Sequence, residues 1–511
     1  MRSLVKILVM PICLVLVQAG SAQAERESTY VKATYSLPLT LDPTQMNDTA
    51  SLQAGNLIYD GLLRFSSSLK IESALAEKWS TSSDGKTLTF HLKPNAKFHD
   101  GRKISANDVV VSLARTLAPH SKVRKFYDCI EGADEKNGTF DHNKLGIKAL
   151  NSSTVQIRLK HPFPPFLSVL AGATAKILPA DQVNSLKFFE APIGSGAFRF
   201  HSKNPKQKTI KLSAFKEYYR GEVQIAHLVL KETNEAEAIK LAQNNQVHDL
   251  ASWPLTANDK VFESGQRVTA PVAATWIIGL NTTKAPFDRV EVRRSFKKAI
   301  DSELFRKAFY PDAIPAHGYI PNGLPGAQTS AIFENVPKKV SSEKITIVIP
   351  EELSRHAEMK SLLEAQLKAQ GWKAEVVSIP WDRLMDGYAQ KSHQAFLVSM
   401  NMDYPDAEFL LRNFESSNPD NFSGLKNEKL DHALKNARTL RDRKERERFY
   451  REAIGLVADS AVTVNLFHPK ANYWVSKCVQ GFEPNLLADV YVDYTKVRLD
   501  PSCESKVAMS E

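Results

Sequence analysis

The sequence predicts a mixed α/β protein with at least two sheets. Residues 87–92 and 154–159 each place apolar side chains at every second position, which is typical of half-buried strands. Further along, a short apolar run at 344–349, apolar residues at helical spacing over 359–367 and an extended run at 372–379 form a βαβ pattern. A βαβ unit requires parallel strands joined by a right-handed crossover, so we expect a parallel sheet in this half of the chain.

Other signals place further elements in order along the chain. Residues 105–108 form a capping box, which predicts a helix from there to Leu117. Prolines over 160–195 indicate a boundary between domains. Apolar residues at helical spacing predict one amphipathic helix over 292–304 and another over 449–457.

Length and composition limit the class of protein. The chain has 511 residues, of which 43% are hydrophobic and 24% are charged. These fractions are ordinary for a folded soluble protein and exclude wholesale disorder, a collagen-like fibre and a polytopic membrane protein. At about 150 residues per domain, the length predicts about three domains.

The first 24 residues have the pattern of a cleavable signal peptide. Two basic residues precede an apolar run over 7–17, which is too short to cross a bilayer as a helix, and 22–24 supply a small-x-small cleavage site. The mature chain would begin near Glu25. Cys13 lacks the small residue that normally precedes a lipidated cysteine, so we expect no lipid anchor. The sequence therefore predicts an exported, periplasmic protein.

The net charge of +10 does not require a nucleic-acid partner. The 67 basic residues are interleaved with 57 acidic residues along the chain. The densest basic run, 441–448, alternates in sign, which is typical of a solvated helix face with i,i+4 ion pairs. Loss of the two basic residues of the leader lowers the charge to +8. We therefore expect no nucleic acid among the partners.

Motifs of the common catalytic chemistries are missing from the sequence. It contains no His-Glu-x-x-His, Cys-x-x-Cys, Walker phosphate loop or Gly-x-Ser-x-Gly elbow. Its Ser-x-x-Lys tetrads, such as Ser67/Lys70, lack their companion motifs, and His99-Asp100-Gly101 is first of all a turn signal. We expect no enzyme, no cofactor and no metal. An exported hydrolase stays open as the alternative, and it would need a nucleophile–base pair.

Four cysteines are too few for a disulfide-dense scaffold, and three of them follow the predicted cleavage site. Export permits a disulfide, and Cys478 and Cys503 are the closer pair in sequence, which would leave Cys129 free. Three unpaired thiols are the alternative, because sequence does not show whether two Cβ atoms face each other.

Residues 87–117, TLTFHLKPNAKFHDGRKISANDVVVSLARTL, carry a resemblance to a known family. They resemble the extracellular solute-binding proteins of family 5, the peptide- and nickel-binding receptors of ABC importers. Further motifs similar to those of the family follow its order along the mature chain. They are Leu41-Asp42-Pro43, Tyr59–Leu63, Leu75–Trp79, Pro192–Phe198, Asn281–Asp301, Asp403–Asp406 and Gly481–Asn485. Each alone is weak, but their shared register is specific.

The resemblance implies a two-lobed periplasmic binding protein of type II, built as a three-domain cluster with hinge closure. Domain I is visited three times, by residues 25–58, 191–278 and 479–511. Domain II is the insertion 59–190, and domain III, the ligand lobe, is 279–478. Closure of domains I and III would bury the ligand.

Asp403 is the ligand-binding residue that the resemblance implies most directly. It matches the aspartate that pairs with the ligand's α-ammonium group in peptide-binding members, with Tyr404 beside it. A carboxylate buried on closure can hold an ammonium group by a charge-assisted hydrogen bond. The alternative is that Asp403 caps the turn at Tyr404-Pro405. Met400 and Ala407 stand where the family commonly has Trp and Pro, and Met400 would line a pocket of different shape.

A cation is expected for the ligand's carboxylate. Arg355 lies close to where the dipeptide receptors carry such an arginine, although not in gapless register, and Arg383 and Arg412 are alternatives. A solvated surface position is the competing interpretation for each. Aromatic side chains often form pocket walls, with core or interdomain packing as the alternative. The candidates are Trp253, Trp276 and Trp381.

The resemblance implies a periplasmic substrate-binding protein that captures peptides and delivers them to an ABC permease and its ATPase in the inner membrane. We expect a monomer. A nickel chelate, haem or another non-peptide solute on the same fold is the alternative ligand class.

Overall fold

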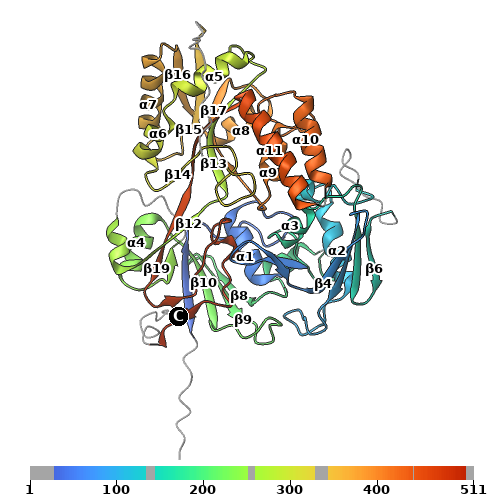
Figure 1. Ribbon diagram of the computed structural model, residues 1–511. Helices are drawn as coiled ribbons and strands as arrows, with labels where there is room; N and C mark the ends of the chain where they lie inside the picture. The colour runs from blue at the N-terminus through green and yellow to red at the C-terminus, as the bar shows by residue number, and fades with distance from the viewer. Residues whose placement is uncertain are drawn as a thin grey trace, which may run out of the picture.

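The computed structural model has two lobes (Figure 1). It describes residues 28–133, 144–183, 185–250, 259–328, 343–440 and 442–501, and the expected leader, Trp253 and Cys503 lie outside these residues. The lower lobe in Figure 1 holds a seven-stranded and a four-stranded sheet, and the upper lobe holds a six-stranded sheet. In the described part of the chain, no helix combines the length and apolar character needed to cross a bilayer.

The seven-stranded sheet gathers strands from distant parts of the chain, in the order β12-β19-β11-β1-β10-β9-β8. Strand β1 runs parallel to its neighbours β10 and β11, and the other pairs are antiparallel. The strands are β1 (Thr29–Thr34), β8 (Phe198–Asn204), β9 (Thr209–Ala214), β10 (His227–Glu232), β11 (Asp249–Leu250), β12 (Gly265–Pro271) and β19 (Lys470–Ser476). Helices α1 (Thr49–Ile58) and α4 (Glu235–Gln243) belong to the same lobe (Figure 1).

The four-stranded antiparallel sheet forms the other side of the lower lobe. Its order is β4-β5-β7-β6. Strand β5 (Thr87–Leu92) buries alternate residues, which confirms the predicted alternation, and β7 (Thr154–Arg158) pairs with it. The remaining strands are β4 (Ala76–Thr81) and β6 (Ile147–Asn151), accompanied by the small pair β2 (Leu63–Phe65) and β3 (Ile71–Ser73).

Helix α2 (Ala106–Thr116) packs on this sheet, and α3 (Phe166–Ala171) packs on the β2–β3 pair and contributes residues to the site described below. Helix α2 begins at the predicted capping box, in which the Ser105 and Asp108 side chains each accept from the other residue's backbone N–H. Helix α3 lies within the proline-rich stretch that was expected to mark a domain boundary.

The six-stranded sheet of the upper lobe has the order β14-β18-β13-β17-β15-β16. The βαβ prediction is confirmed, because β15 (Ile345–Pro350) and β16 (Ala374–Ile379) are parallel and α7 (His356–Ala369) connects them. The other strands are β13 (Ala274–Leu280), β14 (Ile314–Pro315), β17 (Ala395–Asn401) and β18 (Thr463–His468). Helices α8 (Trp381–Ala389), α9 (Ala407–Leu411), α10 (Glu428–Thr439) and α11 (Arg443–Ser460) complete this lobe.

The prediction of a single helix over 292–304 is wrong. The segment forms two helices, α5 (Val290–Ala299) and α6 (Ser302–Phe309). Asp301 stands between them as an N-cap, since its side chain accepts a hydrogen bond of 2.9 Å from the backbone N–H of Leu304. An N-cap of this kind marks the start of a new helix. As a result Leu304, expected on the buried face, is 47% exposed.

The chain crosses between the lower and upper lobes at two adjacent points. Strand β12 of the lower sheet is followed by β13 of the upper sheet, and β18 of the upper sheet is followed by β19 of the lower sheet. The crossings are joined by a hydrogen bond of 2.9 Å from the Val272 N–H to the Pro469 carbonyl. The expected domain limits at 278 and 478 fall several residues after these points.

Two of the three remaining cysteines lie in the described residues. Cys478, just after β19, is disulfide-bonded, whereas Cys129 is a free thiol. Burial raises the pKa of the Cys129 thiol well above its usual range, so this thiol is a poor nucleophile. The expected partner Cys503 lies outside the described residues.

Candidate functional site

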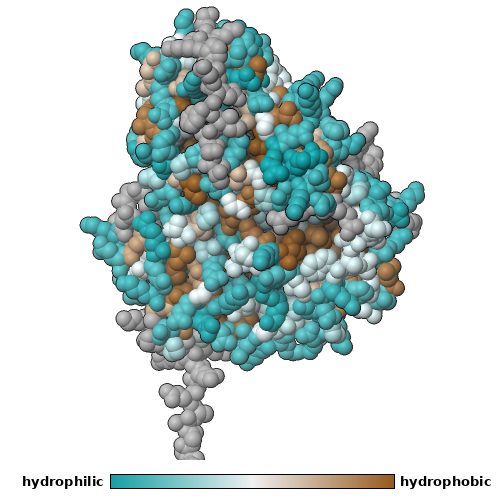
Figure 2. All heavy atoms as spheres, in the orientation of Figure 1, coloured by the Kyte–Doolittle hydropathy of each residue, from teal (hydrophilic) through white to brown (hydrophobic). Residues whose placement is uncertain are grey.

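A cavity of about 440 Å³ lies where the two lobes meet. The lower lobe lines it with residues from 46–52, 122–126, 168–174 and 487–491, and the upper lobe contributes 402–404. Segments of all three expected domains therefore border one space. Figure 2 shows hydrophobic side chains gathered in the hollow between the lobes. A site of this composition, apolar with a few charged groups, is typical of small-ligand pockets.

The Asp403 carboxylate faces this cavity without a protein partner. It lies two residues after the end of β17, and among the described residues it forms no hydrogen bond or ion pair. Its side chain is exposed to the cavity, yet the surrounding protein displaces much of the bulk water. Burial raises the pKa of Asp403, and the nearby positive charges of Lys125 and Arg412 oppose part of that rise. An unpaired carboxylate in such a place favours a cationic ligand group.

The loop that carries Asp403 is anchored by its neighbour Tyr404. This side chain is buried, and its hydroxyl group donates a hydrogen bond of 2.5 Å to Oε2 of Glu408. Glu408 also accepts from Nε of Arg438 at 3.1 Å. The hydrogen bonds among Tyr404, Glu408 and Arg438 fix the loop that follows β17, and Asp403 on this loop faces the cavity.

Asp406 carries the capping role that the sequence left open for Asp403. Its side chain accepts a hydrogen bond of 3.0 Å from the backbone N–H of Glu408, at the start of α9. It also accepts a hydrogen bond of 2.8 Å from the Tyr450 hydroxyl and lies 3.6 Å from the Arg446 guanidinium. The two acids of the Asp-Tyr-Pro-Asp motif thus have different roles: Asp406 stabilises the fold, and Asp403 faces the cavity.

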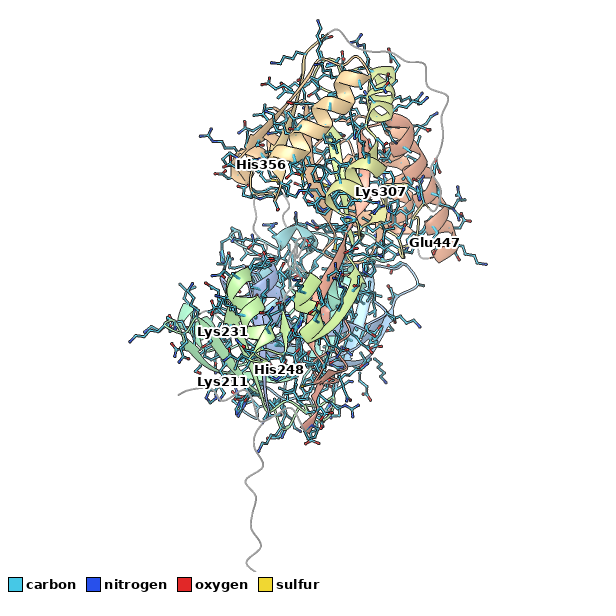
Figure 3. All side chains as sticks on the ribbon, turned by 90° about the vertical axis from the view of Figure 1, so that its left-hand side faces the viewer. Lys211, Lys231, His248, Lys307, His356 and Glu447 are labelled. Atoms are coloured by element: carbon cyan, nitrogen blue, oxygen red, sulfur yellow. The ribbon has the colours of Figure 1, made fainter. Side chains whose placement is uncertain are left out.

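The basic run at 441–448 is only partly a solvated face. Arg448 forms an exposed ion pair with Glu445 at 3.1 Å, at i,i+3 spacing and not at the expected i,i+4, and Glu447 lies at the edge of the molecule in Figure 3. Arg446, however, turns inward to Asp406. This arginine therefore supports the loop behind the cavity.

Sequence reasoning missed the contribution of the lower lobe at 122–126. Lys122, Lys125 and Phe126 all line the cavity. The ring of Phe126 is 6.4 Å from that of Tyr404 and 6.2 Å from that of Phe409, measured between centroids. No local signal marks this segment, since its partners lie far along the chain and only the tertiary fold brings them together.

The predicted cations in the upper lobe do not line this cavity. Arg355 forms an ion pair with Glu358, donates to the Ala308 carbonyl at 2.9 Å and lies over the ring of Phe309. In the side view of Figure 3, its chain neighbour His356 lies on the flank of the upper lobe. Arg383 is exposed on α8.

Arg412 begins a short 3₁₀ helix after α9 and is half-buried. Its positive charge lowers the pKa of Asp403, although its side chain does not line the cavity. Burial alone would lower the pKa of Arg412, but Glu408, Tyr404 and Asp420 together raise it above its usual value, so the guanidinium stays charged. Of the three predicted arginines, Arg412 is the one whose charge reaches Asp403.

The predicted apolar wall residues also lie elsewhere. Trp276 stacks on Tyr310 and Phe467 with centroid distances of 5.8 and 5.7 Å, and it packs against the core of the upper lobe. Trp381 is 46% exposed at the first position of α8. Met400 is half-buried on β17 opposite Thr275 and packs into the core beside the cavity. Asp403 and Tyr404 thus lie at the cavity, whereas Trp276 and Trp381 do not, and Trp253 lies outside the described residues.

A second cavity of about 440 Å³ lies within the upper lobe, between α5, α6, α11 and β18. It borders no residue of the lower lobe. We take the cavity at Asp403 as the candidate site because it joins both lobes and exposes an unpaired charge. In the described residues, no group of three or more His, Cys, Asp or Glu side chains is arranged to hold a metal ion.

Comparison with known proteins assigns the chain to a family. Residues 70–422 match the model of the bacterial extracellular solute-binding proteins, family 5. The chain belongs to this family. The expected resemblance is thereby confirmed over most of the chain.

Relatives with assigned names cover nearly the full length. The dipeptide-binding protein of Pseudomonas aeruginosa is 24% identical over 506 aligned residues, covering 91% of this chain and 94% of the relative. The dipeptide-binding protein of Escherichia coli K12 is 25% identical, with 91% and 93% covered. A glutathione-binding protein of Pectobacterium atrosepticum is 30% identical over a shorter stretch that covers 56% of this chain and 54% of the relative.

Solved structures confirm the fold. The murein tripeptide-binding protein MppA in its unliganded open form superposes with a TM-score of 0.79 at 20% identity, covering 93% of this chain and 98% of that one. The DppA protein of Helicobacter pylori in complex with the peptide STSA gives a TM-score of 0.75 at 22% identity, covering 93% and 99%. The predicted two-lobed architecture of family 5 binding proteins is therefore confirmed.

Proposed function

We propose that the protein is the periplasmic substrate-binding component of an ABC importer and that it captures short peptides. The observation that carries the proposal is the unpaired Asp403 carboxylate in a cavity between two lobes. A peptide's α-ammonium group supplies the missing charge and the hydrogen-bond donors that a carboxylate accepts. The names of the full-length relatives, which are dipeptide-binding proteins, support the same ligand class.

In this proposal the lobes close about the two chain crossings at Val272 and Pro469. Of the expected division, domain II (59–190) is kept, and the limits between domains I and III at 278 and 478 move to the two crossings, because β13 belongs to the upper sheet and β19 to the lower one. Closure would bury the ligand and create the surface that the permease and its ATPase recognise. The protein works as a monomer without a catalytic step, after export and removal of residues 1–24.

Native mass spectrometry of the protein purified from the periplasm of a producing bacterium tests the proposal. We expect a mixture of short peptides to co-purify, and an intact mass that begins at Glu25. If a single nickel chelate or haem co-purifies instead, the ligand is a non-peptide solute and the proposal of peptide binding is wrong. Hydrolysis of added peptides by the purified protein would instead favour the exported hydrolase.

A further inference from the structure

The charged groups around the cavity define what a ligand must carry. Among the described residues that line it, the charged ones are Asp403 from the upper lobe and Lys122 and Lys125 from the lower lobe. The other lining groups are apolar side chains, hydroxyl groups, amides and backbone. A ligand that matches this lining has one ammonium group, one carboxylate and a short body between them.

Both lysines are available to such a carboxylate. Lys125 lies 3.6 Å from Asp420, but the two side chains are 54% and 46% exposed, and exposed pairs of this kind contribute little stability. Among the described residues, the Lys122 side chain reaches one group, the Asn47 amide oxygen, at 3.5 Å. Exchanging either contact for a ligand carboxylate therefore costs little. Arg438 and Arg355, by contrast, are held by several partners each.

Phe126 fixes the position of the lysine pair relative to Asp403. Its ring packs against Tyr404 and Phe409 of the upper lobe, so the adjacent Lys125 lies in the segment that meets the loop carrying Asp403. The charge of Lys125 reaches Asp403 and lowers its pKa, yet the two side chains form no ion pair. Both side chains line the same cavity of about 440 Å³, so a ligand in that cavity can meet both charges.

We propose that Lys122 and Lys125 form the subsite for the ligand's carboxylate, so that domain II takes a direct part in binding. The inference rests on the proposed peptide-binding function and narrows it to short peptides with a free carboxylate. Asp420 then acts as a competitor, since it holds Lys125 when no ligand is bound.

The test uses a pool of di- and tripeptides, offered as free acids and as C-terminal amides, with bound species read by native mass spectrometry and affinities of the retained peptides by calorimetry. For the parent we expect retention of the acids over the amides. The double variant K122A/K125A should bind the acids about 10- to 100-fold more weakly and lose the preference, as expected for a lost charge-assisted contact. The control K148A removes an exposed lysine on β6 of the same lobe and should behave as the parent.

A second variant tests the competing contact between Asp420 and Lys125. D420N removes the competing carboxylate and should raise the affinity for the acids a few-fold without changing the amides. An unchanged preference for the acids in K122A/K125A would overturn this inference and leave the proposed function intact. Failure of the parent to retain any peptide, acid or amide, would overturn both.

Discussion

The ring of Phe126 on the lower lobe meets the ring of Tyr404 on the upper lobe edge to face, with 6.4 Å between centroids. This contact closes one side of the cavity that Asp403 faces. Since such aromatic pairs contribute about 0.5–1.5 kcal/mol beyond their buried area, it biases the two lobes toward each other.

Replacing Phe126 by Ala should therefore shift the ligand-free protein toward a more open arrangement. Loss of the contacts with Tyr404 and Phe409 removes roughly 1 kcal/mol or more, which is about a fivefold change in the ratio of closed to open forms. Small-angle X-ray scattering should record a larger radius of gyration for F126A. The variant L150A, which truncates an exposed residue of β6, serves as control, and an unchanged radius in F126A would contradict the prediction.

Asp403→Asn should weaken the binding of peptides with a free amino group while sparing their N-acetylated forms. Asn keeps the size of the side chain but removes the charge that pairs with the ammonium group. Truncating one partner of such a pair costs about 2–5 kcal/mol, which corresponds to at least a 30-fold loss of affinity by calorimetry. The control D386N changes an exposed acid on α8 of the same lobe. Equal affinities of D403N and the parent for a free-amine peptide would refute the role.

The stability of the lower lobe should fall in mild acid because of His99. Its Nδ1 accepts a hydrogen bond of 3.1 Å from the Gly194 N–H, and its Nε2 lies 3.0 Å from the Gly196 carbonyl. Only the neutral ring fits both partners. Burial lowers the pKa of His99 from 6.5 to about 4. Gly194 packs closely on the chain at Ile58, since a Cβ there would lie 1.9 Å from the Ile58 carbonyl oxygen.

The sign follows from the lowered pKa of His99. Well above pH 6.5 the ring is neutral in both the folded and the unfolded state, so His99 does not lower the free energy of unfolding there. As the pH falls from 6.5 through 4, the unfolded chain takes up the proton first, so the free energy of unfolding decreases. His99→Gln, whose amide can donate and accept, should remove up to about 2 kcal/mol of the loss between pH 7.5 and 5. Urea titrations at both pH values measure this, with H120Q at an exposed position as control. An identical pH dependence in H99Q would contradict it.

Lys176 should destabilise the protein at neutral pH. It is 7% exposed, and its side chain lines a cavity of about 60 Å³ together with Asp60 and Arg64. Burial lowers the pKa of Lys176 from 10.5 to about 8, although the charge of Asp60 opposes the shift. Below pH 8 the folded state carries a buried ammonium group that the unfolded chain would leave in water. This penalty disappears as the pH rises from 8 to 10.5.

Lys176→Met should therefore raise the free energy of unfolding at pH 7 by up to roughly 3 kcal/mol. The gain over the parent should shrink as the pH approaches 10. Chemical denaturation at several pH values measures the difference, and K148M provides the exposed control. A gain that does not vary with pH would show that the ammonium charge is not its source.

Local sequence patterns predicted the secondary elements well where the signal is itself local. The alternation at 87–92, the capping box at Ser105 and the βαβ unit over 344–379 depend on residues close in the chain, and all three are confirmed. The break at Asp301 was missed because helical periodicity continues through it. A single N-cap hydrogen bond decided the boundary there.

The residues of the candidate site were predicted less well than the secondary structure. Asp403 was found from a motif match, but the sequence left two roles open for it. The structure decides between the two roles: Asp406 caps α9 and contacts Tyr450 and Arg446, which leaves Asp403 to face the cavity. The arginine and tryptophan candidates were chosen by residue type, which does not tell where a side chain points.

The sequence by itself determined the family, the α/β class and the acid that faces the cavity, because these depend on residue types in a fixed local order. The tertiary structure alone decided which residues surround that acid. Lys122, Lys125 and Phe126 reach the Asp403 loop only because the insertion that carries them folds against the upper lobe. Contacts between segments nearly 300 residues apart are set by packing and leave no periodicity in either segment.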